Sequence, residues 1–221
     1  MNIDLKIIES LCHECRIPLG EPFIDSMLEE YGRRYNGAWR YYAALRDISM
    51  YLKPSICLEI GTWQGVSAAC LAAGNKEGTV ITIDHHSDPG DFENQQVLAM
   101  AVANYPNIKY IQGCSTEMVW KQKPGTRFVR DDVMKLLDGR KIDLLFIDGW
   151  HGGEYARADF DTYRDLLSDE ALIVCDDIYG AEDVTIYGMK KFWEELPGEK
   201  YLDPDIHGVY QMGFVKLGGM N

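Results

Sequence analysis

The sequence lacks an uninterrupted apolar run of about 18 residues, the length that a membrane-spanning helix needs. Its first residues contain neither the basic segment nor the long apolar segment of a secretory signal. It also contains no run of five or more basic residues, and its formal net charge of -13 repels polyanions. From these absences we expect a cytoplasmic protein that has neither a nucleic acid nor a membrane as a partner.

A second Cys-x-x-Cys motif is missing as well. The six cysteines are scattered along the chain, and four of them fall within or beside apolar segments, where a thiol behaves as a small hydrophobic group. Cys12 and Cys15 form a single Cys-x-x-Cys motif, and a structural zinc site needs a second pair of ligands. We therefore expect neither disulfides nor zinc.

Two common nucleotide fingerprints are also absent, Gly-x-Gly-x-x-Gly and Gly-x-x-x-x-Gly-Lys-Ser/Thr. Instead, Gly61-Thr-Trp-Gln-Gly65 joins an apolar run at 56–60 to a segment at 66–73 whose apolar residues recur at helical spacing. This order predicts a strand, a tight turn and a helix. Such a turn brings backbone and a helix N-terminus up to a ligand, and the missing third glycine and lysine disfavour pyrophosphate.

Strand-like and helix-like segments then alternate along the chain. Strands are predicted at 79–84, 108–112, 141–147 and 171–175, and helices at 92–105, 127–137, 154–167 and 185–196. Alternation of this kind predicts an α/β fold with a doubly wound, mostly parallel sheet. Two further β-like runs between 201 and 217 have no helix between them, so they should pair antiparallel and complete a seven-stranded sheet.

Residues 1–54 carry helical signals without strands, at 3–11, 23–31 and 41–52. We predict an N-terminal helical appendage over 1–54, followed by an α/β domain over 55–221. The polar, glycine-containing connection at 31–39 could let the appendage act as a lid over the binding crevice. The alternative is that these helices only cover one face of the sheet.

Two acidic residues indicate the kind of ligand. Glu59, two residues before Gly61, would repel a phosphate but suits a ligand that carries an ammonium group. Asp84 ends the second predicted strand, where a carboxylate can accept hydrogen bonds from a ribose diol. The Glu59-x-Gly61-x-x-x-Gly65 pattern resembles the first motif of class I S-adenosylmethionine-dependent methyltransferases.

The resemblance implies S-adenosylmethionine as the cofactor, bound around the turn and at the ends of the following strands. In this family the acidic residue at the end of the second strand binds the ribose, and the end of the third strand contacts the adenine. The implied cofactor-binding residues are Glu59, Gly61, Thr62, Trp63, Gly65, Asp84, His85, Ser115 and Asp148. Ser115 stands where the family commonly has Gly-Asp.

Three carboxylates follow the fourth and fifth predicted strands: Asp148, Asp176 and Asp177. Carboxylates on adjacent strand ends repel one another unless a cation or shared protons neutralise them, and Mg²⁺ or Ca²⁺ prefers such oxygen ligands. Phe-Ile-Asp-Gly-x-His and a later Asp-Asp resemble the metal-dependent branch with macrocin-type O-methyltransferases and cephalosporin hydroxylase-like proteins. The resemblance implies these three aspartates as metal ligands. The alternative is that Asp176 or Asp177 caps the following segment without a metal.

His151 is the predicted catalytic base, because an imidazole can take a hydroxyl proton near neutral pH, and Asp148 is the rival base. The expected activity is methyl transfer to an oxygen of a small-molecule acceptor, a sugar or a natural product. Two other functions stay open, a non-catalytic binding or scaffolding protein on the same fold and a nicotinamide oxidoreductase. Neither the acceptor nor homo-oligomer formation is determined by the sequence.

Overall fold

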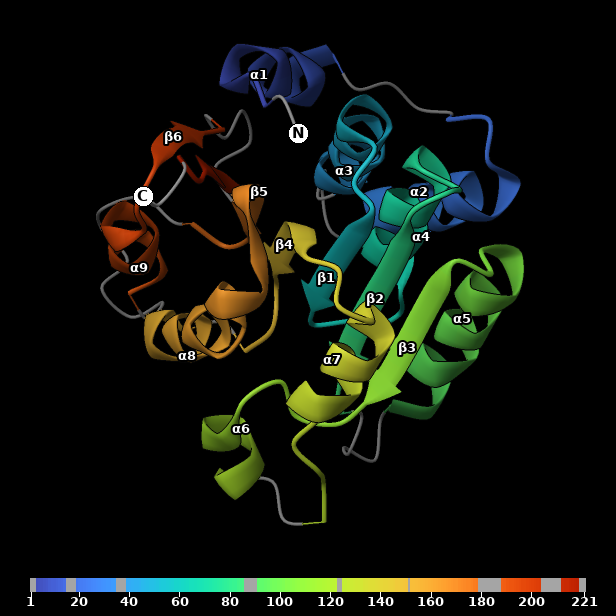
Figure 1. The fold of residues 1–221 in the computed structure, drawn as a ribbon. Coiled ribbons are helices and arrows are strands. Elements are labelled where there is room, and N and C mark those ends of the chain that lie inside the picture. The colour runs from blue at the N-terminus through green and yellow to red at the C-terminus, as the bar shows by residue number, and fades with distance from the viewer. Residues whose placement is uncertain are drawn as a thin grey trace.

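A computed structural model describes residues 3–14, 19–34, 39–85, 91–122, 125–150, 152–178, 188–203 and 212–218. Its centre is a seven-stranded sheet with the strand order β3-β2-β1-β4-β5-β7-β6 (Figure 1). The strands are β1 (Ile56–Ile60), β2 (Thr79–Asp84), β3 (Ile108–Gln112), β4 (Ile142–Ile147), β5 (Leu167–Cys175), β6 (Glu199–Leu202) and β7 (Gly213–Lys216). The first five are parallel, whereas β7 is antiparallel to both β5 and β6. The predicted doubly wound sheet with a terminal antiparallel pair is confirmed.

Helices cover both faces of this sheet (Figure 1). They are α1 (Leu5–Glu14), α2 (Pro22–Arg34), α3 (Trp39–Leu52), α4 (Val66–Gly74), α5 (Asp91–Asn104), α6 (Glu117–Gln122), α7 (Arg130–Leu137), α8 (Gly153–Tyr163) and α9 (Met189–Glu195). Among the described residues, no helix is long and apolar enough to cross a membrane.

Strand β1 shows how the sequence produces two apolar layers. Its alternate residues Ile56, Leu58 and Ile60 pack into one cluster with α7, α8 and α9, while Cys57 packs into the other with α1 to α5. Every residue of β1 is buried, as expected for a central parallel strand covered on both faces. Glu59 is therefore a carboxylate inside an apolar layer.

The N-terminal helices pack on one of these faces. Helix α4 is buried over almost its whole length, from Val66 to Ala72, and α3 lies directly against it. Ile8 of α1, Leu28 of α2 and Ile48 of α3 belong to the same continuous apolar cluster. Residues 35–38, in the centre of the predicted lid connection, lie outside the described residues.

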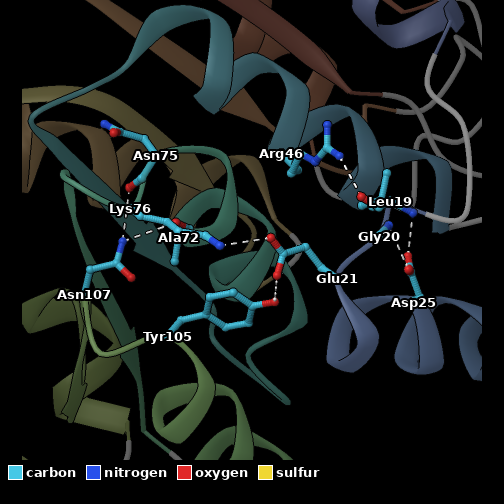
Figure 2. A network of polar contacts seen from close by, with 10 residues as sticks. All are labelled: Leu19, Gly20, Glu21, Asp25, Arg46, Ala72, Asn75, Lys76, Tyr105 and Asn107. Carbon is cyan, nitrogen blue, oxygen red and sulfur yellow. Dashed lines mark hydrogen bonds and ion pairs between the residues drawn. The ribbon is translucent and has the colours of Figure 1, made fainter.

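A polar network fastens the start of α2 to the core (Figure 2). Glu21 accepts a hydrogen bond from the Tyr105 hydroxyl at 3.2 Å and forms an ion pair with Lys76, also at 3.2 Å. In the first turn of α2, Asp25 accepts hydrogen bonds from the backbone N–H groups of residues 19 and 20, which precede the helix. Because Lys76 and Tyr105 follow α4 and α5, these contacts tie the N-terminal segment to two helices of the sheet domain.

Helix α1 extends this face to the far end of the sheet. It contacts β6, and Ile8 shares an apolar cluster with Phe214 of β7 (Figure 1). The N-terminal helix thus packs against the C-terminal strands.

Three segment predictions are wrong in detail. Helix α8 ends at Tyr163 and a 3-10 turn at 164–166 leads into β5, which begins at Leu167. The strand was predicted to begin only at 171, because residues 168–170 are polar. Of the first part of β5 only Leu167 pairs with β4, across an irregular register. Helix α7 begins at Arg130, three residues later than predicted.

Helix α6 was not predicted by the sequence analysis. The Thr116 hydroxyl accepts the Val119 backbone N–H at 3.2 Å and so stabilises the first turn of this helix.

Candidate active site

A cavity of about 570 Å³ opens at the carboxyl ends of β1, β2 and β4. This is the edge at which open α/β sheets bind ligands. Nine of the predicted site residues line it: Gly61, Thr62, Trp63, Asp84, His85, Ser115, Asp148, Asp176 and Asp177. Glu59 and Gly65 stand behind its wall, and His151 lies outside the described residues.

Gly61 begins the turn that forms the floor of the cavity. Its φ is +97°, and its N–H donates to the Ile83 carbonyl oxygen at 3.0 Å. A Cβ atom at this position would lie 1.8 Å from the Asp148 carbonyl oxygen, closer than any real contact. A residue without a side chain is therefore required both by the backbone conformation and by the neighbouring strand.

Gly65 ends the turn, and its predicted contact with the cofactor stays a prediction. It is the N-cap of α4 with φ +74°, and its N–H donates to the Thr62 carbonyl oxygen at 2.6 Å. A Cβ atom here would lie 2.7 Å from Leu98 Cδ1. Gly65 thus lets α5 pack close and directs the N-terminus of α4, while the residues before it face the cavity.

Glu59 is connected to the cavity through two threonines. Its Oε2 accepts the Thr82 hydroxyl, and the Thr82 and Thr62 hydroxyl oxygens lie 2.5 Å apart. Since Thr82 uses its single proton on Glu59, Thr62 must donate to Thr82, which leaves the Thr62 oxygen as an acceptor toward the cavity. Glu59 thus reaches the cavity through the two threonines, and its predicted role in cofactor binding stays a prediction.

Burial raises the pKa of Glu59 to about 7, against the lowering effect of the Ser67 and Thr82 hydroxyls. Its Oε1 accepts no hydrogen bond of normal geometry from the residues that the structure describes. A cation in the cavity would favour the charged form of this carboxylate.

Asp84 holds the turn as well as facing the cavity. Its Oδ2 accepts the Trp63 backbone N–H at 2.8 Å, and Trp63 has a φ of +43°, which is unusual for a bulky residue. The hydrogen bond therefore fixes the position of the Asp84 side chain relative to the Trp63 backbone before any ligand binds. Trp63 itself is 39% exposed.

The three strand-end aspartates converge, as predicted. Burial, then the charges of Asp176, Asp177 and Glu59, raise the pKa of Asp148 well above its ordinary value. The neighbouring carboxylates thus favour a protonated Asp148. Among the described residues, no group of three or more histidine, cysteine, aspartate or glutamate side chains is arranged to hold a metal ion.

Asp159 is a cavity residue that the sequence analysis missed. It comes from α8, is 2% exposed, and its Oδ1 accepts the Ser115 hydroxyl at 2.6 Å. Burial raises the pKa of Asp159 to about 7. The signal was present, because Asp159 lies three residues after Ala156 and four before Tyr163, on the apolar stripe of the predicted helix.

Aromatic side chains surround the opening of the cavity. Trp150 is 46% exposed, and its ring stacks on Tyr155 of α8 with centroids 5.3 Å apart. Tyr41 and Tyr42 bring α3 to the cavity wall. The N-terminal helices thus contribute to the site, whether or not they move as the predicted lid.

Solved methyltransferases share this fold. The O-methyltransferase TomG from Streptomyces achromogenes, involved in tomaymycin synthesis and solved with SAM, has a TM-score of 0.64 and 16% identity, covering 99% of this chain and 100% of that one. The O-methyltransferase from Bacillus cereus in complex with SAH has a TM-score of 0.59 and 14% identity, covering 96% of this chain and 97% of that one. SAH-bound PaMTH1 from Podospora anserina has a TM-score of 0.59 and 17% identity, with the same coverage of the two chains.

Sequence comparison gives a curated relative and a family. The chain is 24% identical over 215 residues to the uncharacterized protein y4gI of Sinorhizobium fredii (strain NBRC 101917 / NGR234). That alignment covers 93% of this chain and 21% of y4gI, so the chain spans about a fifth of its length. The profile of a methyltransferase domain matches residues 58–178, more than half of the chain, and the protein belongs to this methyltransferase family.

Proposed function

We propose that the protein is an S-adenosylmethionine-dependent O-methyltransferase that acts on a small molecule, a sugar or a natural product. One observation carries the proposal: hydrogen-bond acceptors lie at two points of the cavity where this cofactor would present donors. Asp84 would accept from the ribose hydroxyls, and the Thr62 oxygen, directed by Glu59, would accept from the ammonium group. The three solved relatives named above, which share the fold, contain SAM or SAH.

The remaining parts of the cofactor suit the same turn. The N-terminus of α4 has no side-chain cap and carries a positive dipole end, which suits the carboxylate of the amino-acid part. With both ends held, the sulfonium methyl would point into the cavity. Methyl transfer is an in-line displacement, so holding the acceptor oxygen opposite the sulfur would supply much of the rate.

The acceptor hydroxyl must lose a proton during the transfer. His151 and Asp148 are the proposed bases, and Asp148 lines the cavity. Asp148, Asp176 and Asp177 supply the carboxylate oxygens that a hard divalent cation prefers, and a cation would relieve the repulsion that raises the pKa of Asp148. The three described side chains are not arranged to hold a metal ion, so they would have to draw together around it. A bound Mg²⁺ would lower the pKa of the acceptor hydroxyl.

A small acceptor agrees with the charge of the molecule. A net charge of -13 opposes nucleic acids and anionic membranes, and we propose a cytoplasmic location on the same composition. The direct test is to incubate the protein with S-adenosylmethionine and hydroxylated small molecules and to measure S-adenosylhomocysteine by mass spectrometry. Acceptor-dependent S-adenosylhomocysteine supports the proposal, whereas binding without turnover would favour a non-catalytic protein.

Asp84→Asn should weaken cofactor binding by on the order of tenfold or more. The amide can still accept the Trp63 N–H, so the turn stays formed, but the charge-assisted bonds to the ribose are lost. Calorimetric titration with S-adenosylhomocysteine measures the effect. Asp143→Asn is the matched control, because Asp143 accepts the Ser55 N–H and does not line the cavity. Equal affinities of Asp84→Asn and wild type would place the ribose elsewhere.

Added Mg²⁺ or Ca²⁺ should raise the melting temperature in a concentration-dependent manner if the aspartate cluster binds a cation. The double variant Asp176→Asn with Asp177→Asn should lose this response, while Asp143→Asn keeps it. Thermal melts in EDTA, Mg²⁺ and Ca²⁺ decide the matter. Identical wild-type curves in all three buffers, with activity undiminished by EDTA, would rule out the metal and leave His151 or Asp148 as a base without metal assistance.

A further inference from the structure

A chain of three polar side chains leads from the buried interior of the sheet to the cavity. Glu59 of β1 and Thr82 of β2 are fully buried and do not line the cavity, whereas Thr62, in the turn after β1, does. Thr82 donates its hydroxyl proton to Glu59 Oε2, and the Thr82 and Thr62 hydroxyl oxygens lie 2.5 Å apart. Hydrogen bonding from Glu59 therefore reaches a ligand through the two hydroxyls.

The protonation state of Glu59 sets the direction of every bond in this chain. An ionised Glu59 can only accept, so Thr82 donates to it and Thr62 donates to Thr82. The Thr62 oxygen is then an acceptor toward the cavity. A protonated Glu59 donates to Thr82, and because each hydroxyl carries a single proton, Thr82 donates to Thr62 instead. Thr62 then turns its own O–H group toward the cavity.

The proton of a neutral Glu59 belongs on Oε2. The Thr82 hydroxyl oxygen lies within hydrogen-bond distance of Oε2, whereas Oε1 has no partner of normal geometry among the described residues. A buried polar hydrogen without an acceptor is costly, so the neutral carboxyl group favours the reversed chain. Protonation of this one group thus converts Thr62 from an acceptor to a donor.

Glu59 changes its charge near neutral pH. Burial and the charge of Asp84 raise its pKa to about 7, against the lowering effect of the Ser67 and Thr82 hydroxyls. Its charge also acts on three further described groups, which belong to the end of β4, to β1 and to α4: Asp148, Cys57 and Cys70. Burial raises the pKa of both thiols so far that they stay neutral in this range.

We infer that the Glu59–Thr82–Thr62 chain is a polarity switch that couples binding of the cofactor's ammonium group to the loss of a proton from Glu59. This inference rests on the proposed function. It makes Glu59 and Thr82 positioning residues, because they act on the ligand through Thr62. An ammonium group has only donors, so it binds the acceptor form of Thr62 and is opposed by the donor form. On binding, a protonated Glu59 therefore releases its proton to solvent.

The test compares S-adenosylhomocysteine with its analogue that lacks the α-amino group, by calorimetry at pH 6.0 and pH 7.5. EDTA is present, so that no divalent cation reaches Asp148. With a pKa of about 7, roughly a tenth of the Glu59 carboxyls are ionised at pH 6.0 and roughly three quarters at pH 7.5. The preference of wild type for the amino ligand should therefore be about fivefold or more smaller at pH 6.0. Titrations in buffers of different ionisation enthalpy should show proton release that the analogue does not cause.

Thr82→Val keeps the shape of the side chain and the ionisable Glu59 but interrupts the chain. Its preference for the amino ligand should be equal at both pH values, because Glu59 no longer directs Thr62. Thr82→Ser retains a hydroxyl and should restore the wild-type pH dependence. Thr79→Val is the matched control, because it makes the same substitution at the start of β2, outside the cavity, and should also keep the pH dependence.

A pH dependence that persists in Thr82→Val would overturn the inference, because the charge of Glu59 would then act through space. A wild-type preference that is equal at both pH values would overturn it as well, and in both cases the proposed function stands. If Thr82→Val fails to fold, Thr62→Val, which removes the cavity end of the chain, takes its place with the same expectation. Wild type that binds neither ligand would overturn the proposed function and this inference with it.

Discussion

Replacing Gly61 by alanine is expected to destabilise the protein by about 4 kcal/mol or more and to abolish cofactor binding. Two effects add at this position, a φ of +97° and a Cβ atom only 1.8 Å from the Asp148 carbonyl oxygen. The clash is with the backbone of the neighbouring strand, so a rotamer change cannot relieve it. Chemical denaturation gives the free energy of unfolding, and titration with S-adenosylhomocysteine gives the binding.

Gly139→Ala is the matched control. Gly139 has a φ of +79° but nothing within 4 Å of its Cβ position, so only the conformational cost of about 1 kcal/mol applies. The difference between the two variants isolates the contact with Asp148. If both variants lost the same free energy, the close approach of the turn to β4 would not be a constraint.

The protein without cofactor is expected to be more stable at pH 5.5 than at pH 7.5. Burial raises the pKa of both Glu59 and Asp159 to about 7, whereas these carboxyls titrate near their ordinary values in the unfolded chain. Between the unfolded-state pKa and the folded-state pKa of each carboxyl, the folded protein binds more protons than the unfolded chain. The free energy of unfolding therefore falls as the pH rises toward 7. Each carboxyl contributes about 2 kcal/mol over this interval, together on the order of 10 °C in melting temperature.

The double variant Glu59→Gln with Asp159→Asn should flatten this dependence, because neither amide titrates. Asp148, whose pKa is also raised, contributes with the same sign and leaves a residual slope. Asp132 has its pKa lowered by Arg127 and acts in the opposite direction, but only at pH values below the measured interval. Calorimetric melts at the two pH values measure the effect. A wild-type melting temperature that is equal or higher at pH 7.5 would contradict the assignment.

Most of the fold could be predicted because its strands are buried on both faces. Runs such as 56–60 and 142–147 are apolar without a break, and the helices between them carry one apolar stripe each. The errors occur where tertiary contacts override the local pattern. The first part of β5 is polar and pairs with β4 only at Leu167, and the short α6 depends on the Thr116 cap.

The sequence allowed prediction of those site residues that stand at the carboxyl end of a strand. Asp84, Asp148, Asp176 and Asp177 all line the cavity for this reason. Which neighbour a side chain contacts was beyond the sequence: Glu59 acts through Thr82, a residue of another strand, and Asp159 meets Ser115 across 44 positions. Such pairs depend on strand order and helix placement, which residue patterns alone do not contain.

The contact between α1 and β6 has a consequence for the order of folding. The two elements lie roughly 190 residues apart in the chain, and contacts at such separations form late because a long loop must first close. During synthesis, α1 could pack on α3 soon after both are made, whereas its contact with β6 must wait until the C-terminal strands have been made. The packing of α3 on α4, separated only by β1 and its turns, could form long before. The contact of α1 with β6 would thus be among the last to form, although the helix itself can pack earlier on α3.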